Sequence, residues 1–142
     1  MTIFVEGKIH GKGRPRFSRS GVVYTDAQTK AYEEAIAAAY KTEHGELIGG
    51  APVKVYIEAR FKIPAYETKA NKFAMQRDKI RPTKKPDIDN VAKVVLDALN
   101  GVAFSDDKQV VDLYVRKVYA INEGLRIVVE EMKLEKVRKS RK

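Results

Sequence analysis

Cysteine is absent from this chain of 142 residues, and histidine occurs only twice. No disulfide framework is therefore possible, and at this length none is needed, because a single core buries about two thirds of the unfolded surface. Neither His10 nor His44 has the setting of a Ser-His-Asp triad. No apolar run is long enough to span a bilayer, and the N-terminus lacks the apolar core of a signal peptide. We expect a cytoplasmic, single-domain protein.

Charge of one sign dominates. Lys and Arg number 28 against 19 for Asp and Glu, which gives a net charge of +9. This excess favours a polyanionic partner, although it says nothing about the fold. Acid is concentrated in two short segments, KPDIDN and SDDKQVVD, and acid clustered in a basic protein favours a metal site. The twelve-residue loop pattern of an EF-hand is missing.

The first half of the chain predicts a strand, a helix and a second strand. TIFVEGKI is rich in β-branched and aromatic residues and ends at the glycines of a basic loop, 11–21. Thr25 with Gln28 fits a capping box, so we expect a helix to begin there and to end at Gly45. From Val53 to Ile63 apolar and polar residues alternate, as in a half-buried strand.

The second half predicts a helix and two strands. Segment 64–85 is basic, weakly periodic and bracketed by prolines, so we expect it to be the least ordered internal stretch, helical only in part. Apolar residues recur at helical spacing from Asp87, the expected N-cap, to Gly101. Two strand-like runs, 110–121 and 125–133, are separated by a short turn and predict an antiparallel hairpin.

The predicted fold is therefore α+β, with a mixed four-stranded sheet and two main helices in the order β-α-β-α-β-β, ending in the hairpin. We expect one domain over residues 1–135, with 64–85 as a mobile basic segment, and a basic tail over 136–142.

Four aspartates form the candidate site. Residues two apart on a helix point about 200° from each other, so Asp87 and Asp89 can share an ion only if Asp87 is a cap at the helix start. The short connection GVAFS then returns Asp106 and Asp107 to the same end. Such an open arrangement suits Mg²⁺, which usually takes one or two carboxylates, waters and phosphate oxygens.

Each of these features also has an ordinary structural explanation. Asp is common at caps and in turns, and Asp89 with Lys93 makes an ordinary surface pair one helical turn apart. Lys93 can equally neutralise the carboxylates or contact a phosphate.

KPDIDNVAKVVLDALNGVAFSDDKQV, residues 85–110, resembles the signature stretch of RusA-type crossover-junction endodeoxyribonucleases, a family common in phages and prophages. GKGRPRFSRSGVVYTDAQTKAYEEAI, residues 11–36, looks like the basic loop and first helix of that family. The resemblance implies Mg²⁺-dependent hydrolysis of four-way DNA junctions in recombination or repair, with Mn²⁺ as a substitute. It implies that Asp87, Asp89 and Asp107 bind the metal and that Lys93 assists at the phosphate. Asp106 also matches the family pattern, either as a further ligand or as a neighbour of the ligands.

The resemblance also implies a homodimer with two active sites, acting on branched DNA and on no membrane or small molecule. A four-way junction has approximate two-fold symmetry, and two symmetric nicks need two sites. Expected DNA contacts are basic side chains, because phosphates dominate such affinity: Lys12, Arg14, Arg16, Arg19, Lys84 and Lys85. Lys69, Lys72, Arg77, Lys79 and Arg81 are further candidates.

Phe17 lies among basic residues of the first loop. It could act as a wedge between bases, but we expect such a phenylalanine to pack on the core. Two other functions fit the same sequence. One is a DNA-binding module without catalysis, and the other is a related nuclease that acts on forks or flaps.

Overall fold

The computed structural model describes residues 1–13, 16–24 and 26–133. Four strands form one sheet in the order β1-β6-β4-β5: β1 (Thr2–Glu6), β4 (Val53–Lys62), β5 (Val110–Ala120) and β6 (Gly124–Glu131). β4 is parallel to β5 and antiparallel to β6, which in turn is antiparallel to β1. The predicted single α+β domain with a mixed four-stranded sheet is confirmed.

The last two strands do not form the predicted hairpin. β5 and β6 run in opposite directions, but β4 lies between them. β4 and β5 are joined by a long helical crossover, which is the connection that parallel neighbours need, so β6 pairs with the other edge of β4. The central position of β4 agrees with its burial, since Val53, Val55, Ile57 and Ala59 have no exposed surface.

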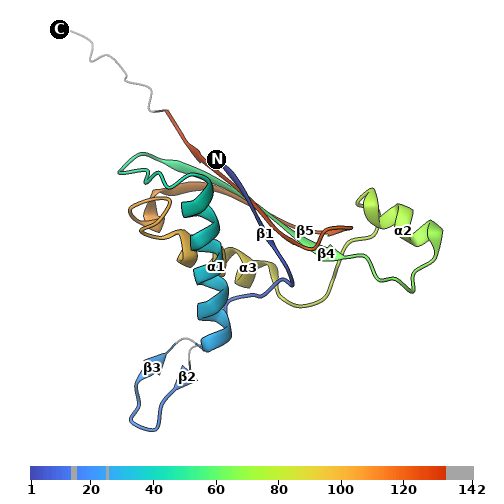
Figure 1. The fold of residues 1–142 in the computed structure, drawn as a ribbon, viewed down its shortest axis with the longest axis horizontal. Helices are drawn as coiled ribbons and strands as arrows, with labels where there is room; N and C mark the ends of the chain where they lie inside the picture. Colours follow the sequence, from blue (N-terminus) through green and yellow to red (C-terminus); the bar gives the residue numbers. More distant parts are fainter. Residues whose placement is uncertain (14–15, 25, 134–142) are drawn as a thin grey trace, which may run out of the picture.

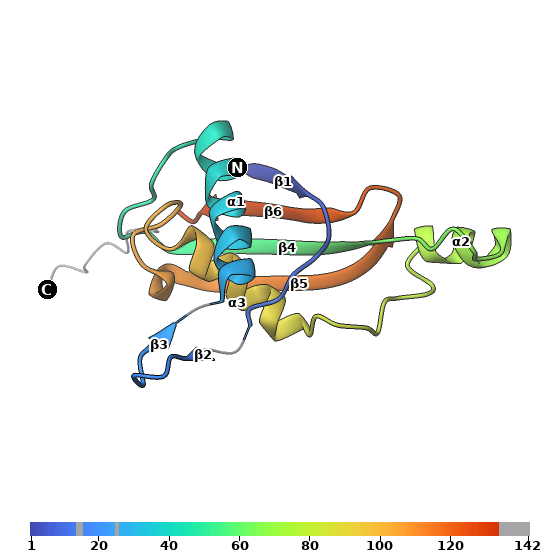
Figure 2. The same ribbon diagram turned by 60° about the horizontal axis from the view of Figure 1, so that its bottom comes forward.

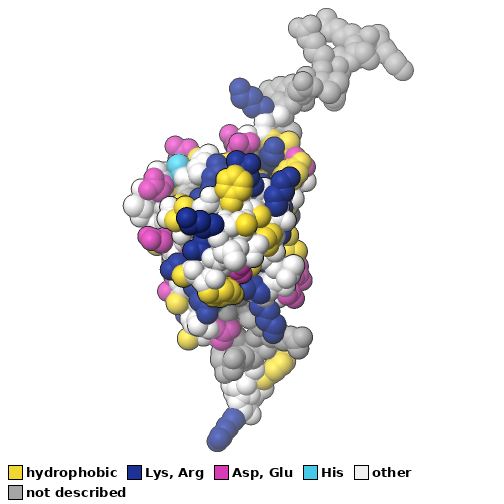
Figure 3. Space-filling model, turned by 90° about the vertical axis from the view of Figure 1, so that its right-hand side faces the viewer, with side chains coloured by type: hydrophobic (Ala, Val, Ile, Leu, Met, Phe, Trp, Pro, Cys, Tyr) yellow, Lys and Arg dark blue, Asp and Glu magenta, His cyan; other side chains and the backbone are white. Residues whose placement is uncertain are grey.

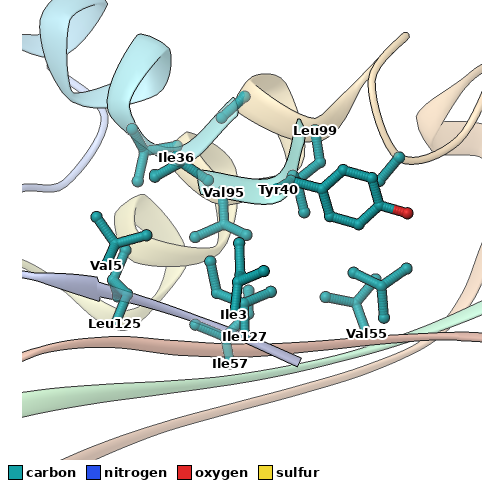
Figure 4. Packing of buried hydrophobic residues seen from close by; sticks show 14 of the residues in the cluster. Ile3, Val5, Ile36, Tyr40, Val55, Ile57, Val95, Leu99, Leu125 and Ile127 are labelled. Carbon is teal, nitrogen blue, oxygen red and sulfur yellow. The ribbon is translucent and has the colours of Figure 1, made fainter. Parts of the chain in front are cut away.

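Two helices, α1 (Ala27–Glu43) and α3 (Ile88–Leu99), cover the same face of the sheet (Figure 1). Ile36 of α1 and Val95 of α3 pack against Ile57 and Ile127 of the sheet (Figure 4). Fully burying an aliphatic side chain of this size contributes about 1.5–3 kcal/mol, so this layer fixes α3 firmly on the sheet. In the part of the chain that the structure describes, the other sheet face carries no helix along most of its length (Figure 1).

The two main helices begin at aspartates. α1 starts at Asp26, whose carboxylate accepts hydrogen bonds from the amide and the hydroxyl of Thr29 at 2.9 and 2.8 Å. The sequence predicted Thr25 as the capping residue, in a box with Gln28, and this was wrong because Asp26 is the N-cap of α1. Thr25 itself lies outside the described residues. α3 begins after Asp87, and its buried residues follow the predicted spacing: Val91, Val94, Val95, Ala98 and Leu99.

The hairpin in the first basic loop was not predicted, whereas segment 64–85 was expected to be helical in part and contains one helix (Figure 2). The first basic loop contains a short hairpin of β2 (Arg16–Phe17) and β3 (Val23–Tyr24). Segment 64–85 contains α2 (Lys69–Gln76), capped by the Thr68 hydroxyl, which accepts from the Asn71 amide at 3.1 Å. The order of the main elements is therefore β-α-β-α-α-β-β. Among the described residues, no helix is long and apolar enough to cross a membrane. The predicted tail, 136–142, lies outside them.

Candidate active site in the groove between α3 and β5

A groove of about 510 Å³ runs between α3 and β5 and is open to solvent. Asp89 and Lys93 line it from α3, Asp107 lines it from the turn between α3 and β5, and Leu113 and Val115 form part of the opposite wall. Three of the four residues predicted to be catalytic therefore meet on one groove.

The helix explains why Asp89 and Lys93 point into the same space. They are four residues apart, so their side chains lie on one face of α3, about one turn from each other. Val91 and Val95 on the opposite face are completely buried in the core. Lys93 is exposed, and in the part of the chain that the structure describes it forms no ion pair with Asp89 or Asp107. Its ammonium group therefore faces the groove without being neutralised by either carboxylate.

Asp107 begins a short 3₁₀ turn, η1 (Asp107–Gln109), that a capping box holds in shape. The Asp106 carboxylate accepts from the Lys108 amide, and the Gln109 side-chain carbonyl accepts from the Asp106 amide, both at 2.9 Å. Gln109 is buried, and its Nε2 donates to the carbonyls of Ile48 and Ala51 at 3.1 and 2.9 Å. The turn that carries Asp107 is thus tied to the segment before β4.

Sequence reasoning assigned no role to Gln109. The signal was present, because Asp106 followed three residues later by Gln109 is the spacing of a capping box. Asp97 was also overlooked: it lines the same groove two helical turns beyond Asp89.

Asp106 has a structural role in this turn and does not line the groove. The hydrogen bond from the Lys108 amide holds the pKa of Asp106 below its ordinary value, and the neighbouring Asp107 side chain acts in the same direction. Its carboxylate is therefore ionised at neutral pH. Metal binding by Asp106 stays a prediction.

Asp87 is the N-cap residue of α3 by position, as predicted, but its side chain makes no cap hydrogen bond. Its backbone carbonyl accepts from the Val91 amide at 3.1 Å, which is the first hydrogen bond of the helix. The carboxylate is exposed at the helix N-terminus, where the helix dipole favours its negative charge. Asp87 is not part of the groove wall but precedes Ile88 and Asp89, which are.

The groove suits an open metal site better than a closed one. Among the described residues, no group of three or more His, Cys, Asp or Glu side chains is gathered closely enough to hold a metal ion. Asp89 and Asp107 nevertheless line one groove. Proteins usually bind Mg²⁺ through one or two carboxylates, and water and phosphate oxygens complete its coordination. The donor set therefore fits Mg²⁺.

The predicted DNA contacts have different surroundings. Lys12 is largely covered, and its ammonium group lies 2.8 Å from Glu33 and 3.1 Å from Asp97. Burial alone would lower its pKa, but the hydrogen bonds to these two carboxylates raise the pKa of Lys12 above its ordinary value. Lys12 thereby joins α1 to α3, and its role in DNA binding stays a prediction.

The other basic candidates lie on projecting segments. Arg19 is exposed at the turn of the β2–β3 hairpin, Arg16 lies in β2, and Arg14 lies outside the described residues. Lys84 and Lys85 are exposed just before α3, where the backbone carbonyl of Lys84 accepts from Lys117.

Phe17 does not pack on the core, contrary to our expectation. It is 71% exposed on the β2–β3 hairpin. A pair of two-residue strands offers no second layer under which a phenylalanine could be buried. Its use as a base wedge stays a prediction.

The model of the protein family described as "Endodeoxyribonuclease RusA" matches residues 6–130, a range that contains the whole groove. The chain belongs to the RusA endodeoxyribonuclease family. The chain is also similar to the "Uncharacterized protein YqaN" of Bacillus subtilis (strain 168), with 34% identity over 133 residues, which cover 90% of this chain and 94% of the relative.

Membership of the RusA family confirms the resemblance seen in residues 85–110 and implies an endonuclease that acts on DNA. Nucleases of the RusA family depend on a metal, and the family implies a branched DNA substrate. The groove between α3 and β5 carries three acidic side chains, those of Asp89, Asp97 and Asp107.

Proposed function

We propose that this chain is a structure-specific endonuclease that resolves four-way DNA junctions by paired, Mg²⁺-dependent phosphodiester hydrolysis. The observation that carries the proposal is that Asp89 and Lys93 of α3 and Asp107 of the following turn line one open groove. The groove belongs to a protein with a net charge of +9, which attracts a phosphate backbone.

Asp89 and Asp107 are the residues that would hold the ion, and Asp87, the N-cap residue of α3, is the third candidate ligand. When bound, Mg²⁺ supplies Lewis acidity toward the phosphate and lowers the pKa of water. The contribution of the chain is to hold these carboxylates on a helix and a capped turn, so that they need little reorganisation. Asp106 keeps that turn in place.

Lys93 would contact the scissile phosphate. Its ammonium group faces the groove one helical turn after Asp89 and is not paired with the two groove carboxylates, so it is available to balance charge that develops on phosphate oxygens. Lys93→Met should therefore lower the cleavage rate by about 10²–10³-fold, the range for loss of one such group. Junction affinity should change far less.

A homodimer is part of the proposal. Both nicks on a four-way junction lie at sites related by its two-fold symmetry, and one groove cannot reach both at once. Light scattering of the purified protein should give twice the mass of the 16.0 kDa chain, and the saturated junction complex should have the mass of two chains plus one junction. A monomeric mass in the junction complex would contradict the paired mechanism.

The direct test is cleavage of a synthetic four-way junction by the purified protein with Mg²⁺. Asp89→Asn should bind the junction but not cut it. Asp112→Asn is the matched control, because Asp112 precedes the groove residue Leu113 on β5 and so faces the other side of the sheet. Cleavage that survives in Asp89→Asn would contradict the assignment of Asp89.

A panel of substrates separates this proposal from the two other functions. A junction resolvase cuts the four-way junction in preference to forks, flaps and linear duplex. A related nuclease would prefer the fork or the flap. A binding module would retain junction affinity and cut nothing in either Mg²⁺ or Mn²⁺.

A further inference from the structure

Segment 64–85, which we call the α2 arm, links β4 to α3 and projects beyond the end of the sheet (Figure 1). It contains seven Lys and Arg residues but only two acidic ones. Its net charge of +5 (seven minus two) is more than half of the net charge of +9 of the whole chain. This concentration of charge lies outside the groove described above.

The α2 arm is attached to the body by specific contacts. Met75 of α2 is buried, as is Val118 of β5, and neither belongs to the main core. Asp78 accepts from the Arg116 guanidinium at 2.9 Å, and Arg81 Nε donates to the Lys117 carbonyl at 2.8 Å. One face of α2 is therefore fixed against β5.

The opposite face of α2 presents aromatic rings to solvent. Phe73 is two residues from the buried Met75, which places it about 200° around the helix, and it is 55% exposed. Tyr66, in the turn before α2, is 85% exposed. The Arg77 guanidinium lies over the Phe73 ring, 3.9 Å from its centre, so the cation covers one face of the ring and leaves the other face free of it. No packing requirement within the described residues explains these exposed rings.

We propose that the α2 arm is a second DNA-contact surface, on which Tyr66 and Phe73 stack against unpaired bases near the branch point of the substrate. This inference rests on the proposed function. Aromatic rings set among cations are what unpaired nucleic acid binds, since the cations follow the phosphates and each base offers a flat face. Figure 3 shows the end of the molecule that carries α2, where Lys and Arg side chains are interspersed with hydrophobic ones.

The course of the chain connects this surface to the groove. After α2 the chain runs back toward the start of α3 (Figure 2). Lys84 and Lys85 are exposed on that return and directly precede Asp87 and the groove residue Asp89. A strand that leaves the groove along this return passes the exposed side chains of Lys84, Arg81 and Lys79 before it reaches the rings of the α2 arm.

The test compares binding of a four-way junction and of a linear duplex by variants that keep every charge of the α2 arm. Affinities are measured without divalent metal, so that nothing is cut. Phe73→Leu and Tyr66→Leu should each weaken junction binding about tenfold, within the range for loss of one base–aromatic stack, and should leave duplex binding within about twofold. Phe73→Tyr should restore junction affinity, because it restores a ring.

Two controls make the result specific. Leu47→Ala removes an exposed apolar side chain before β4, at the other end of the sheet from the α2 arm, and should change neither affinity. A junction that carries 2-aminopurine at the branch point should change its fluorescence on binding the unsubstituted protein but not the double leucine variant.

The binding measurements test the stacking role and the proposed function separately. Unchanged junction binding in both leucine variants, or an equal loss for junction and duplex, would overturn the stacking role while leaving the proposed function intact. If the unsubstituted protein does not prefer the junction to the duplex, the proposed function itself fails, and the stacking role fails with it.

Discussion

Gln109 should be the residue on which both stability and catalysis depend. Its side chain makes three hydrogen bonds, one from the Asp106 amide and two to the carbonyls of Ile48 and Ala51. A net contribution of about 1 kcal/mol each, with an added penalty for buried groups left unpaired, gives a loss of about 2–4 kcal/mol for Gln109→Ala. For a domain of this size, that loss lowers the Tm by on the order of 10 °C.

The same substitution should slow cleavage. Without Gln109 the Asp106 amide loses its partner, the capping box opens, and Asp107 is no longer held at the groove. Because a displacement of about 1 Å at an active site can lower the rate about 10²-fold, we expect kcat on a four-way junction to fall by about 10- to 100-fold. Junction affinity should fall by less than about threefold, since Gln109 is buried and cannot touch DNA.

The assays are urea denaturation followed by circular dichroism and single-turnover cleavage at a temperature where the variant is fully folded. Gln28→Ala is the matched control, because Gln28 is exposed on α1 and such surface changes usually stay within about 0.5 kcal/mol. A Gln109→Ala protein as stable as the control would refute the structural argument. A destabilised variant with normal cleavage would refute the link from the turn to Asp107.

Three further outcomes are expected. Lys12→Ala should destabilise the fold by about 1–3 kcal/mol, because it leaves the partly covered carboxylates of Glu33 and Asp97 without their cation. The same substitution should change the junction affinity by no more than about twofold. A large drop in affinity with normal stability would instead make Lys12 a DNA contact. Burial would raise the pKa of Glu58, but the hydrogen bonds from Arg60 and Tyr56, together with the charges of Arg60 and Arg126, outweigh it and hold that pKa below its ordinary value of 4.5. The stabilisation is therefore present above pH 4.5 and is lost as pH falls through the lowered folded-state pKa. Urea midpoints measured from pH 7 to pH 3 should therefore fall less steeply for Glu58→Gln than for the unsubstituted protein. Junction binding should weaken by orders of magnitude between about 50 and 200 mM salt, as titration by fluorescence anisotropy would show, and an affinity independent of salt would contradict a phosphate-based interface.

Local patterns predicted the parts of the fold that depend on local geometry. The spacing of Val91, Val95 and Leu99 predicted α3 because a helix repeats every 3.6 residues, and the same geometry places Asp89 and Lys93 on one face. The alternation of apolar and polar residues from Val53 onward predicted β4, because successive side chains of a strand point to opposite faces of the sheet.

What the sequence did not predict depends on contacts between distant segments. The short connection after β5 is typical of a hairpin. In this sheet, however, β5 and β6 pair with opposite edges of β4 and do not pair with each other. Met75 fixes α2 only because β5 lies beneath it, and a helix of eight residues is too short to be recognised from its own pattern. The pairing of Lys12 with Asp97 likewise joins residues that are remote in the chain.

The position of β5 at the margin of the sheet has a consequence for the topology of the substrate. In the described part of the chain, β5 pairs with β4 alone, and Leu113, which lines the groove, is 41% exposed there. The groove is thus open along its side, so a polymer can be laid into it without being threaded from one end. A cruciform extruded from a covalently closed DNA circle, which has no end to thread, should be cut as readily as a junction assembled from short oligonucleotides.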